Sequence, residues 1–273
     1  MPCKSLSGGG CLDFDLFCPV KGIIVLITYP PFTGQNDAEW LDFPDLLTDI
    51  PWPPGNRECL KGLFITCRIY LSINKRTFMD TFSKAISHIM KSEVGPWWDE
   101  NHPACLTGSI ATRDDRRATG YVNDLNDRGG ITKFGVAKAS NPDLSITTLT
   151  YDAAKRVYYK KYWLAGDCAD IALFAPKLAM LHFDGCVNHG IGRASKIIQE
   201  AVGASIDGDI GPKSLEAIKR ACGASGGELK VCERVAQLRR QLYQQIVRRD
   251  ASQQRFLNGW TNRIDEVLAF VKE

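Results

Sequence analysis

A single carboxylate stands at the expected end of a helix in the stretch HIMKSEVGPW, residues 88–97. Phe82, Ile86 and Ile89 recur at helical spacing, and at about 100° per residue Glu93 falls within roughly 40° of their direction. Its side chain would therefore point to the buried side, in a last turn whose dipole disfavours an anion. Burial and dipole both favour the protonated form of a carboxyl, the form that a general acid needs to protonate a leaving oxygen. The alternative is that the helix ends earlier and that Glu93 faces water.

A second group of polar side chains lies in GYVNDLNDRGGITKFGV, residues 120–136, which is dense in turn-forming residues and is expected to form a hairpin. Its closely spaced amides and carboxylates are Asn123, Asp124, Asn126 and Asp127. They could hold a sugar by hydrogen bonds, supply a second carboxylate or form Asx turns. A calcium loop is excluded, because Gly135 stands where an EF-hand beginning at Asp124 needs a glutamate.

The bulk composition restricts the class of protein. The chain has 273 residues, 44% of them hydrophobic, and a net charge of +3, which is ordinary for a globular protein and does not mark a nucleic-acid binder. Its longest apolar run, GIIVLITY, is shorter than the roughly 18–20 residues that span a bilayer. The N-terminus lacks the pattern of a secretory signal. We therefore expect no nucleic-acid partner, no stable membrane insertion, and synthesis in the cytoplasm without a signal peptide.

The ten cysteines do not follow a metal-binding or disulfide framework. No C-x-x-C occurs, and the chain is too long to be a small scaffold stapled by disulfides. With no export signal, reduced thiols are the expectation.

Residues 1–78 differ from the rest of the chain. They hold eight of the 13 prolines and five of the ten cysteines, and beyond two strand-like runs at 23–28 and 63–71 they show little periodicity. We interpret them as a largely irregular, poorly structured N-terminal extension. It is either an accessory or targeting segment, or sequence absent from the working protein if Met79 is the true start.

From Met79 onward the pattern is helical. The apolar spacing predicts helices at 80–93, 150–163, 171–188, 190–202, 212–222, 227–249 and 259–272. The fold class is therefore mainly α, with one small β-hairpin between the first two helices.

Five motifs in this helical part, taken in order, resemble a known family. They are Glu93-Val94-Gly95, GYVNDLNDRGGITKFGV, YYKKYWLAG, HFDGCVNHGIGRASKIIQEAVG and DGDIGPKSL. Together they are similar to the phage-type muramidases of glycoside hydrolase family 108, joined to their C-terminal predicted peptidoglycan-binding domain. The resemblance covers residues 79–273. It implies a lysozyme-like catalytic domain at 79–180 and a helical peptidoglycan-binding domain at 181–273.

The resemblance also implies roles for particular residues. In that family a compact Glu-Gly-Gly-Tyr motif begins with the catalytic acid, which implies Glu93 here. Asp124 is the first choice for the second catalytic carboxylate, and Thr132 would position a water or a sugar hydroxyl. From the side chains themselves, and beyond what the resemblance implies, we expect Tyr121, Asn123, Asp127, Trp97 and Trp98 to bind substrate. Asp127 is the second choice for the second carboxylate.

This sequence departs from the family pattern in the motif itself. Residues 96–119 interrupt it, and Val94 replaces a glycine. Read without the insertion, the acid position would be Ala118, and the chain would be an inactive peptidoglycan-binding protein. Trp97 and Trp98 in the insertion either stack on sugar faces or anchor the insertion to the core.

A zinc enzyme is the remaining alternative. His182, Cys186 and His189 lie at i, i+4 and i+7, a spacing that could bind zinc and would indicate an amidase or peptidase that cuts the peptide stems. No H-E-x-x-H and no fourth ligand accompany them, and apolar residues interleave with them, which favours a packed helix. We therefore expect no metal and no cofactor.

The sequence thus predicts a peptidoglycan hydrolase, a lysozyme that cleaves the β-1,4 bond between N-acetylmuramic acid and N-acetylglucosamine. Its partners would be peptidoglycan glycan strands, and we expect a monomer. It would leave the cytoplasm through a holin pore or a secretion system and act at the cell wall or in the periplasm.

Overall fold

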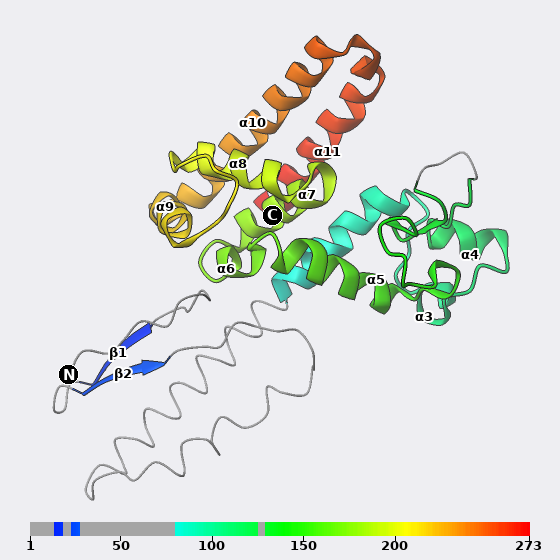
Figure 1. The fold of residues 1–273 in the computed structure, drawn as a ribbon, viewed down its shortest axis with the longest axis horizontal. Helices are drawn as coiled ribbons and strands as arrows, with labels where there is room; N and C mark the ends of the chain where they lie inside the picture. The colour runs from blue at the N-terminus through cyan, green and yellow to red at the C-terminus, as the bar shows by residue number, and fades with distance from the viewer. Residues whose placement is uncertain (1–13, 19–22, 28–79, 125–128) are drawn as a thin grey trace, which may run out of the picture. The chain divides into compact units, whose positions relative to one another are not determined.

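The computed structural model describes residues 14–18, 23–27, 80–124 and 129–273, and the chain divides into two compact units, 1–57 and 58–273. In the first unit, β1 (Phe14–Cys18) pairs antiparallel with β2 (Ile23–Ile27). The strand-like run predicted at 63–71 lies outside the described residues. The second unit is mainly helical with one small antiparallel hairpin, which confirms the predicted fold class (Figure 1).

The second unit begins, as described, with a helix over residues 80–94. The α-helices that follow are α3 (Pro103–Thr107), α4 (Arg113–Ala118), α5 (Tyr151–Tyr158), α6 (Cys168–Ala172), α7 (Pro176–His189), α8 (Ile191–Val202), α9 (Pro212–Cys222), α10 (Gly227–Arg249) and α11 (Gln254–Lys272). Short turns of 3-10 helix lie at η1 (Ile146–Thr148) and η3 (Ala251–Gln253), and a π-helix, η2 (Tyr159–Leu164), continues α5. The hairpin consists of β3 (Thr132–Lys133) and β4 (Val136–Ala137).

The helix over residues 80–94 buries the apolar stripe that its sequence predicts. Phe82, Ile86 and Ile89 are at most 6% exposed. The ring of Phe82 lies 5.4 Å from Trp163 of η2 and 5.8 Å from Phe183 of α7, so the helix rests on both elements. Glu93 follows this stripe by one turn, which fixes the direction in which it can point.

Helix α7 is the centre of the unit, with α6, α8, α10, α11 and η2 packed around it. Both apolar and polar side chains of α7 are buried, among them Phe183, His182 and Asp184, and they lie on more than one side of the helix. This is typical of a helix in the core. The prediction of one helix over 171–188 is wrong, because the chain forms α6 and α7 separately. Pro176 begins α7 as its first residue, and a proline has no N–H to continue a preceding helix.

The C-terminal helices form a long antiparallel pair, α10 and α11, beside α7 and α8 (Figure 1). The turn before α9 is braced from α8: Gln199 donates to Asp207 Oδ1 at 2.6 Å and accepts from the Gly208 amide at 2.9 Å. Asp207 Oδ1 also accepts from the Asp209 amide at 3.0 Å, so hydrogen bonds from α8 and from within the turn hold its shape.

The insertion forms two short helices that the sequence did not predict, α3 and α4. A capping box between Thr112 and Asp115 begins α4. The Lys133 amine of the hairpin is fully buried and donates to the carbonyl of Gly108 at 2.6 Å, and burial lowers its pKa. This bond ties the insertion to the hairpin.

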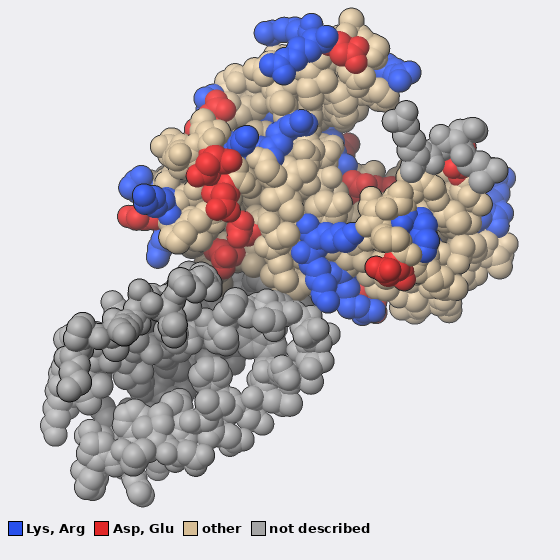
Figure 2. All heavy atoms as spheres, in the orientation of Figure 1, with Lys and Arg blue, Asp and Glu red and all other residues tan. Residues whose placement is uncertain are grey.

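In the part of the chain that the structure describes, no helix combines the length and apolarity needed to cross a membrane. Lys, Arg, Asp and Glu side chains intersperse over the face drawn in Figure 2, so a single charge sign does not dominate that face.

Candidate active site

The end of the helix over 80–94 meets the beginning of the hairpin region. A Cβ placed on Gly120 would lie 3.2 Å from the Cα of Val94, so the two backbones touch. The chain leaves this point at Gly95 and returns at Gly120, both with positive φ (95° and 58°). The insertion, residues 96–119, therefore loops out from this point and returns to it. Glu93 and Val94 stand in space directly before Gly120 and Tyr121, although a long stretch of sequence separates them.

The hairpin continues from this junction. Val122 and Thr132 exchange two backbone hydrogen bonds of 2.9 Å, and the Phe134 amide donates to the Thr119 carbonyl at 2.8 Å. Phe134 and Gly135 form the two-residue turn between β3 and β4 with φ values of 51° and 71°, as a type I′ turn requires. A buried phenylalanine at positive φ is strained, and such strain concentrates at functional sites.

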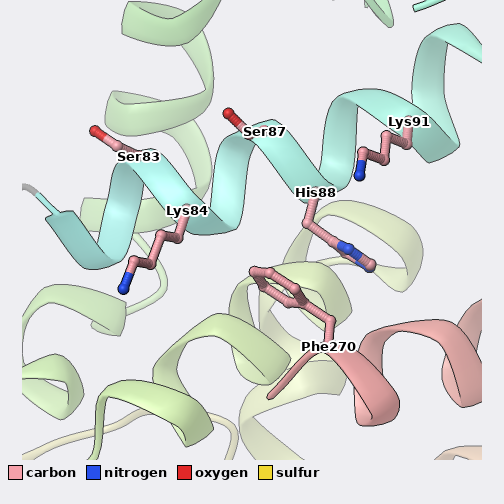
Figure 3. Close-up of a pocket in the computed structure, with 6 residues that line it drawn as sticks. All are labelled: Ser83, Lys84, Ser87, His88, Lys91 and Phe270. Atoms are coloured by element: carbon pink, nitrogen blue, oxygen red, sulfur yellow. The ribbon is translucent and has the colours of Figure 1, made fainter. Parts of the chain in front are cut away.

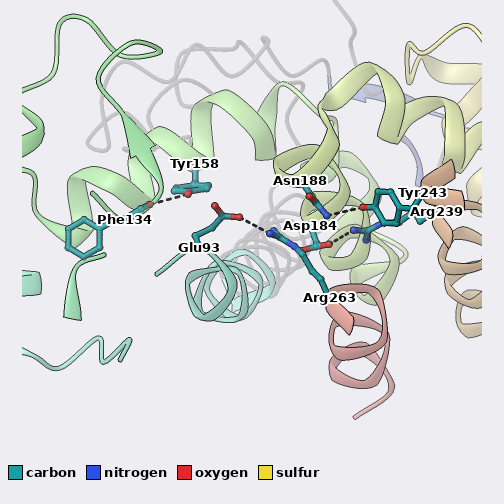
Figure 4. A network of polar contacts seen from close by, with 8 residues as sticks. All are labelled: Glu93, Phe134, Tyr158, Asp184, Asn188, Arg239, Tyr243 and Arg263. Carbon is teal, nitrogen blue, oxygen red and sulfur yellow. Dashed lines mark hydrogen bonds and ion pairs between the residues drawn. The ribbon is translucent and has the colours of Figure 1, made fainter. Parts of the chain in front are cut away.

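This turn lies against Glu93. A Cβ added to Gly135 would lie 3.1 Å from Glu93 Oε2 and only 2.3 Å from the hydroxyl oxygen of Tyr158, so only glycine fits. The Tyr158 hydroxyl donates to the Phe134 carbonyl at 3.0 Å (Figure 4). Burial, and then the nearby Glu93, raise the pKa of Tyr158 well above its usual value. Tyr158 thus stays a neutral hydrogen-bond donor that fixes the turn beside Glu93.

On its other side Glu93 meets a chain of charges. Its Oε1 lies 2.8 Å from Nη1 of Arg263 on α11, and Arg263 Nε lies 2.8 Å from Oδ1 of Asp184 on α7. Asp184 Oδ2 accepts in turn from Arg239 on α10 at 2.6 Å (Figure 4). We call these four residues the Asp184 network. Its two carboxylates balance its two guanidinium groups, which is the condition for burying so many charges.

The prediction for Glu93 is therefore only partly met. The side chain points inward and is 22% exposed, but it faces a cation in place of an apolar wall. Sequence periodicity could not reveal Arg263, which lies 170 residues further along the chain.

The pKa of Asp184 shows that the cations of the network outweigh the effect of burial. Complete burial alone would raise the pKa of this carboxyl, but Arg239 and Arg263 outweigh burial and hold it below its usual value. Asp184 is thus a permanent anion in the core, and it orients Arg263 toward Glu93.

Two parts of the chain match known families. Residues 116–190 match glycosyl hydrolase 108, and residues 193–265 match the predicted peptidoglycan domain, in the order that the sequence motifs predict. The chain thus carries a segment similar to glycosyl hydrolase 108, followed by a segment similar to the predicted peptidoglycan domain. It is a glycoside hydrolase that acts on peptidoglycan, binds it as its partner and works at the cell wall.

Comparison with whole proteins adds little to this assignment. The structure of Brucella abortus SagA is 24% identical, covers 71% of this chain and 94% of its own, and superposes with a TM-score of 0.46. No curated protein matches the chain.

The bounds of the family match bear directly on the site. The match to glycosyl hydrolase 108 begins at residue 116 and so includes Ala118 but not Glu93. Ala118 is 4% exposed at the end of α4 and carries no chemistry. Asp184 lies in the glycosyl hydrolase 108 segment and Arg263 in the peptidoglycan domain, so both segments contribute to the environment of Glu93.

A small pocket opens beside Gly135 on the side of Tyr158. It has a volume of about 80 Å³ and is lined in part by Gly135, Asn141, Tyr158, Lys161 and Tyr162. Burial, and then Glu93, also raise the pKa of Tyr162. This volume is enough to hold water beside the turn at Gly135.

A larger pocket of about 360 Å³ lies elsewhere, between the helix over 80–94 and α11 (Figure 3). Lys84, His88 and Lys91 line it, and the His88 ring stacks on Phe270 with 4.4 Å between centroids. Its lining includes neither Glu93 nor the hairpin.

The residues predicted on the hairpin lie at different depths. Tyr121 and Thr132 are partly buried, and the Thr132 hydroxyl donates to the Gly130 carbonyl at 3.3 Å. Asn123 and Asp124 are exposed. Asp127 lies outside the described residues. The roles assigned to these side chains stay predictions.

The two tryptophans of the insertion differ. Trp97 is 61% exposed, with the Arg117 guanidinium 4.9 Å from the centre of its ring. Trp98 packs edge-on against Tyr151 and Phe134, with centroids at 4.8 Å and 6.1 Å. Trp98 therefore anchors the insertion to the core, whereas Trp97 is free to meet a ligand on its exposed area.

The three side chains that the sequence offered as an alternative zinc site, His182, Cys186 and His189, do not all come together in the structure. His182 and Cys186 are grouped with Cys168, which begins α6, and not with His189. His189 packs near Gly185 and Tyr243 instead. The described cysteines, Cys105, Cys168, Cys186, Cys222 and Cys232, are free thiols, as the sequence predicts.

Proposed function

We propose that this enzyme is an N-acetylmuramidase that cleaves the β-1,4 bond between N-acetylmuramic acid and N-acetylglucosamine, with Glu93 as the general acid. The observation that carries the proposal is the position of Glu93. Its carboxylate lies against Gly135 and Tyr158, and the next residue, Val94, touches Gly120. The interrupted motif is thereby made continuous in space.

The chemistry needs a proton on the glycosidic oxygen and a partner for the oxocarbenium-like transition state. We assign the proton to Glu93 and the second role to Asp124, with Asp127 as the other candidate. Thr132 would position a water or a sugar hydroxyl. Tyr121, Asn123, Trp97 and Trp98 would contact the sugar rings.

Arg263 also takes part in this scheme. After Glu93 has given up its proton, the guanidinium at 2.8 Å stabilises the carboxylate that remains. The same contact orients the side chain of Glu93 beside the turn at Gly135.

The competing candidate is an inactive peptidoglycan-binding protein with Ala118 at the acid position. It is favoured by the family match, which begins after Glu93. An Ala118→Glu variant distinguishes the two. If Glu93 is the acid, a glutamate in the packed end of α4 adds no activity.

The chemistry is tested by the products. Purified peptidoglycan is digested with the full chain, and new reducing ends and free amino groups are counted while mass spectrometry identifies the fragments. We expect reducing ends on N-acetylmuramic acid and no new amino groups. Reducing ends on N-acetylglucosamine would overturn the assigned bond, and free amino groups that disappear with a chelator would favour the zinc amidase.

The proposal extends to organisation and export. A catalytic part at 79–180 and a binding part at 181–273 would act together as a monomer, with the N-terminal extension 1–78 outside both. Synthesis without a signal peptide would require a holin pore or a secretion system to reach the wall.

A further inference from the structure

Three side chains with metal-binding atoms meet in the core, away from Glu93. They are Cys168 at the beginning of α6 and His182 and Cys186, one turn apart on α7. One ligand atom of each lies within 4.8 Å of the others, and each residue is at most 2% exposed. The proposed muramidase chemistry uses none of them.

The spacing of these atoms fits zinc. The Cys186 sulfur lies 3.6 Å from Nε2 of His182. In a tetrahedral site with Zn–S near 2.3 Å and Zn–N near 2.0–2.1 Å, neighbouring ligand atoms are about 3.5–3.8 Å apart. The sulfur–nitrogen edge already has this length, and the other edges need to shorten by at most about 1 Å.

The backbone of the loop between η2 and α6 contacts this cluster closely. A Cβ on Gly166 would lie 2.8 Å from the Cys186 sulfur, so only glycine fits there. The next residue, Asp167, has a φ of 55°, an uncommon conformation for a residue with a side chain. The Gly166 carbonyl oxygen lies 2.9 Å from Nε2 of His182. The loop thus brings this oxygen close to two of the three ligands, since it also lies 3.7 Å from the Cys168 sulfur.

We propose that Cys168, His182 and Cys186 bind one Zn²⁺, and that the Gly166 carbonyl oxygen occupies the fourth position. Two thiolates neutralise the ion, so the buried site is uncharged overall. Binding releases one proton from each thiol that is protonated. His182 binds through its Nε2 lone pair with its ring proton on Nδ1, so the present Nε2–Gly166 contact is replaced by two bonds to the metal.

The role of such a site is structural. Four protein ligands leave no position for water or substrate, unlike a catalytic zinc. The metal would join the loop after η2 to α7, and η2 continues the helix that carries Tyr158. It would therefore stabilise the wall beside Glu93 without taking part in the reaction.

The test is the metal content of the full chain, purified without chelators. We expect about one zinc per chain, measured by inductively coupled plasma mass spectrometry after dialysis. Cys168→Ser, Cys186→Ser and His182→Asn should each lower the bound zinc at least tenfold. Cys232→Ser removes a thiol that is equally buried but lies on α10, outside the cluster, and should leave the zinc content unchanged.

A second measurement uses the unaltered chain, in case a variant does not fold. A strong zinc chelator should lower the thermal midpoint, and added zinc should restore it. Co²⁺ bound in place of zinc should give the absorption of thiolate–cobalt charge transfer. A wild-type chain that binds no zinc, variants that keep it all, or a Cys168–Cys186 disulfide found after alkylation would each overturn the proposal.

Discussion

Two regions that meet at Glu93 differ in the burial and in the pairing of their polar side chains. On one side the Asp184 network is held by helices α7, α10 and α11, and Asp184 and Arg239 are each 1% exposed. On the other side Asn123 and Asp124 lie on an exposed segment of the hairpin region. The first region fixes the acid from within the fold, and the second offers polar groups to solvent. Changes in the first should cost stability, and changes in the second should cost only activity.

The largest effect should come from Asp184. Replacing it in Asp184→Asn leaves Arg239 buried without its anion, which costs about 3–5 kcal/mol of unfolding free energy. Urea denaturation measures the loss. Glu233→Gln is the control, because it breaks the ion pair with Lys272 on the surface and should leave stability unchanged. Equal losses in the two variants would remove the distinction between the regions.

Arg263 connects the two regions, so its replacement should change both activity and stability. Arg263→Gln removes the cation that pairs with the Glu93 carboxylate, and the rate at which reducing ends form should fall by about tenfold. Stability should also fall in urea denaturation, because Asp184 loses a partner. Arg263→Lys keeps the charge and should lose less of the rate. An unchanged rate in Arg263→Gln would mean that the contact does not support the catalytic carboxylate.

His189 should make the stability of the buried region depend on pH. Burial, and then Arg239, lower the pKa of its ring to about 3. The unfolded chain, with an ordinary histidine pKa near 6.5, binds the proton first. Stability should therefore fall as the pH drops from about 6.5 toward 3, by at most about 1.4 kcal/mol per pH unit from this residue. His189→Gln should reduce that slope in thermal melts, and an identical slope would show that the ring is already charged in the fold.

The smallest effect should come from the insertion. Trp97→Ala should raise KM by about three- to tenfold without changing stability, if the exposed ring stacks on sugar. Trp98→Ala should instead lower the unfolding midpoint, because that ring packs on Tyr151 and Phe134. Loss of stability in Trp97→Ala, with KM unchanged, would assign both rings to packing.

The sequence predicted those features that depend on local pattern. The apolar spacing that begins with Phe82 predicted the first helix and the inward direction of Glu93. The glycine-rich sequence around residue 130 predicted the hairpin. The local pattern predicted one helix at 171–188, where Pro176 in fact divides the segment into two. It also missed α3 and α4 in the insertion, because these short helices depend on caps and on the buried Lys133.

The candidate site was less predictable, since its contacts join distant parts of the chain. Arg263 reaches Glu93 from another helix, and Cys168 joins His182 and Cys186 from the helix before. Neither contact leaves a periodic signal near its partner. The second carboxylate stays a prediction, because Asp124 borders the segment 125–128, which lies outside the described residues.

The position of Glu93 is the central claim, and Glu93→Gln tests it most directly. Glutamine keeps the size of the side chain and a hydrogen-bond acceptor for Arg263, but has no acidic proton. The rate at which reducing ends form on purified peptidoglycan should fall by about 10²–10⁴-fold, while Glu200→Gln, an exposed change on α8, should retain the full rate. Equal rates in Glu93→Gln and the unaltered chain would contradict the account.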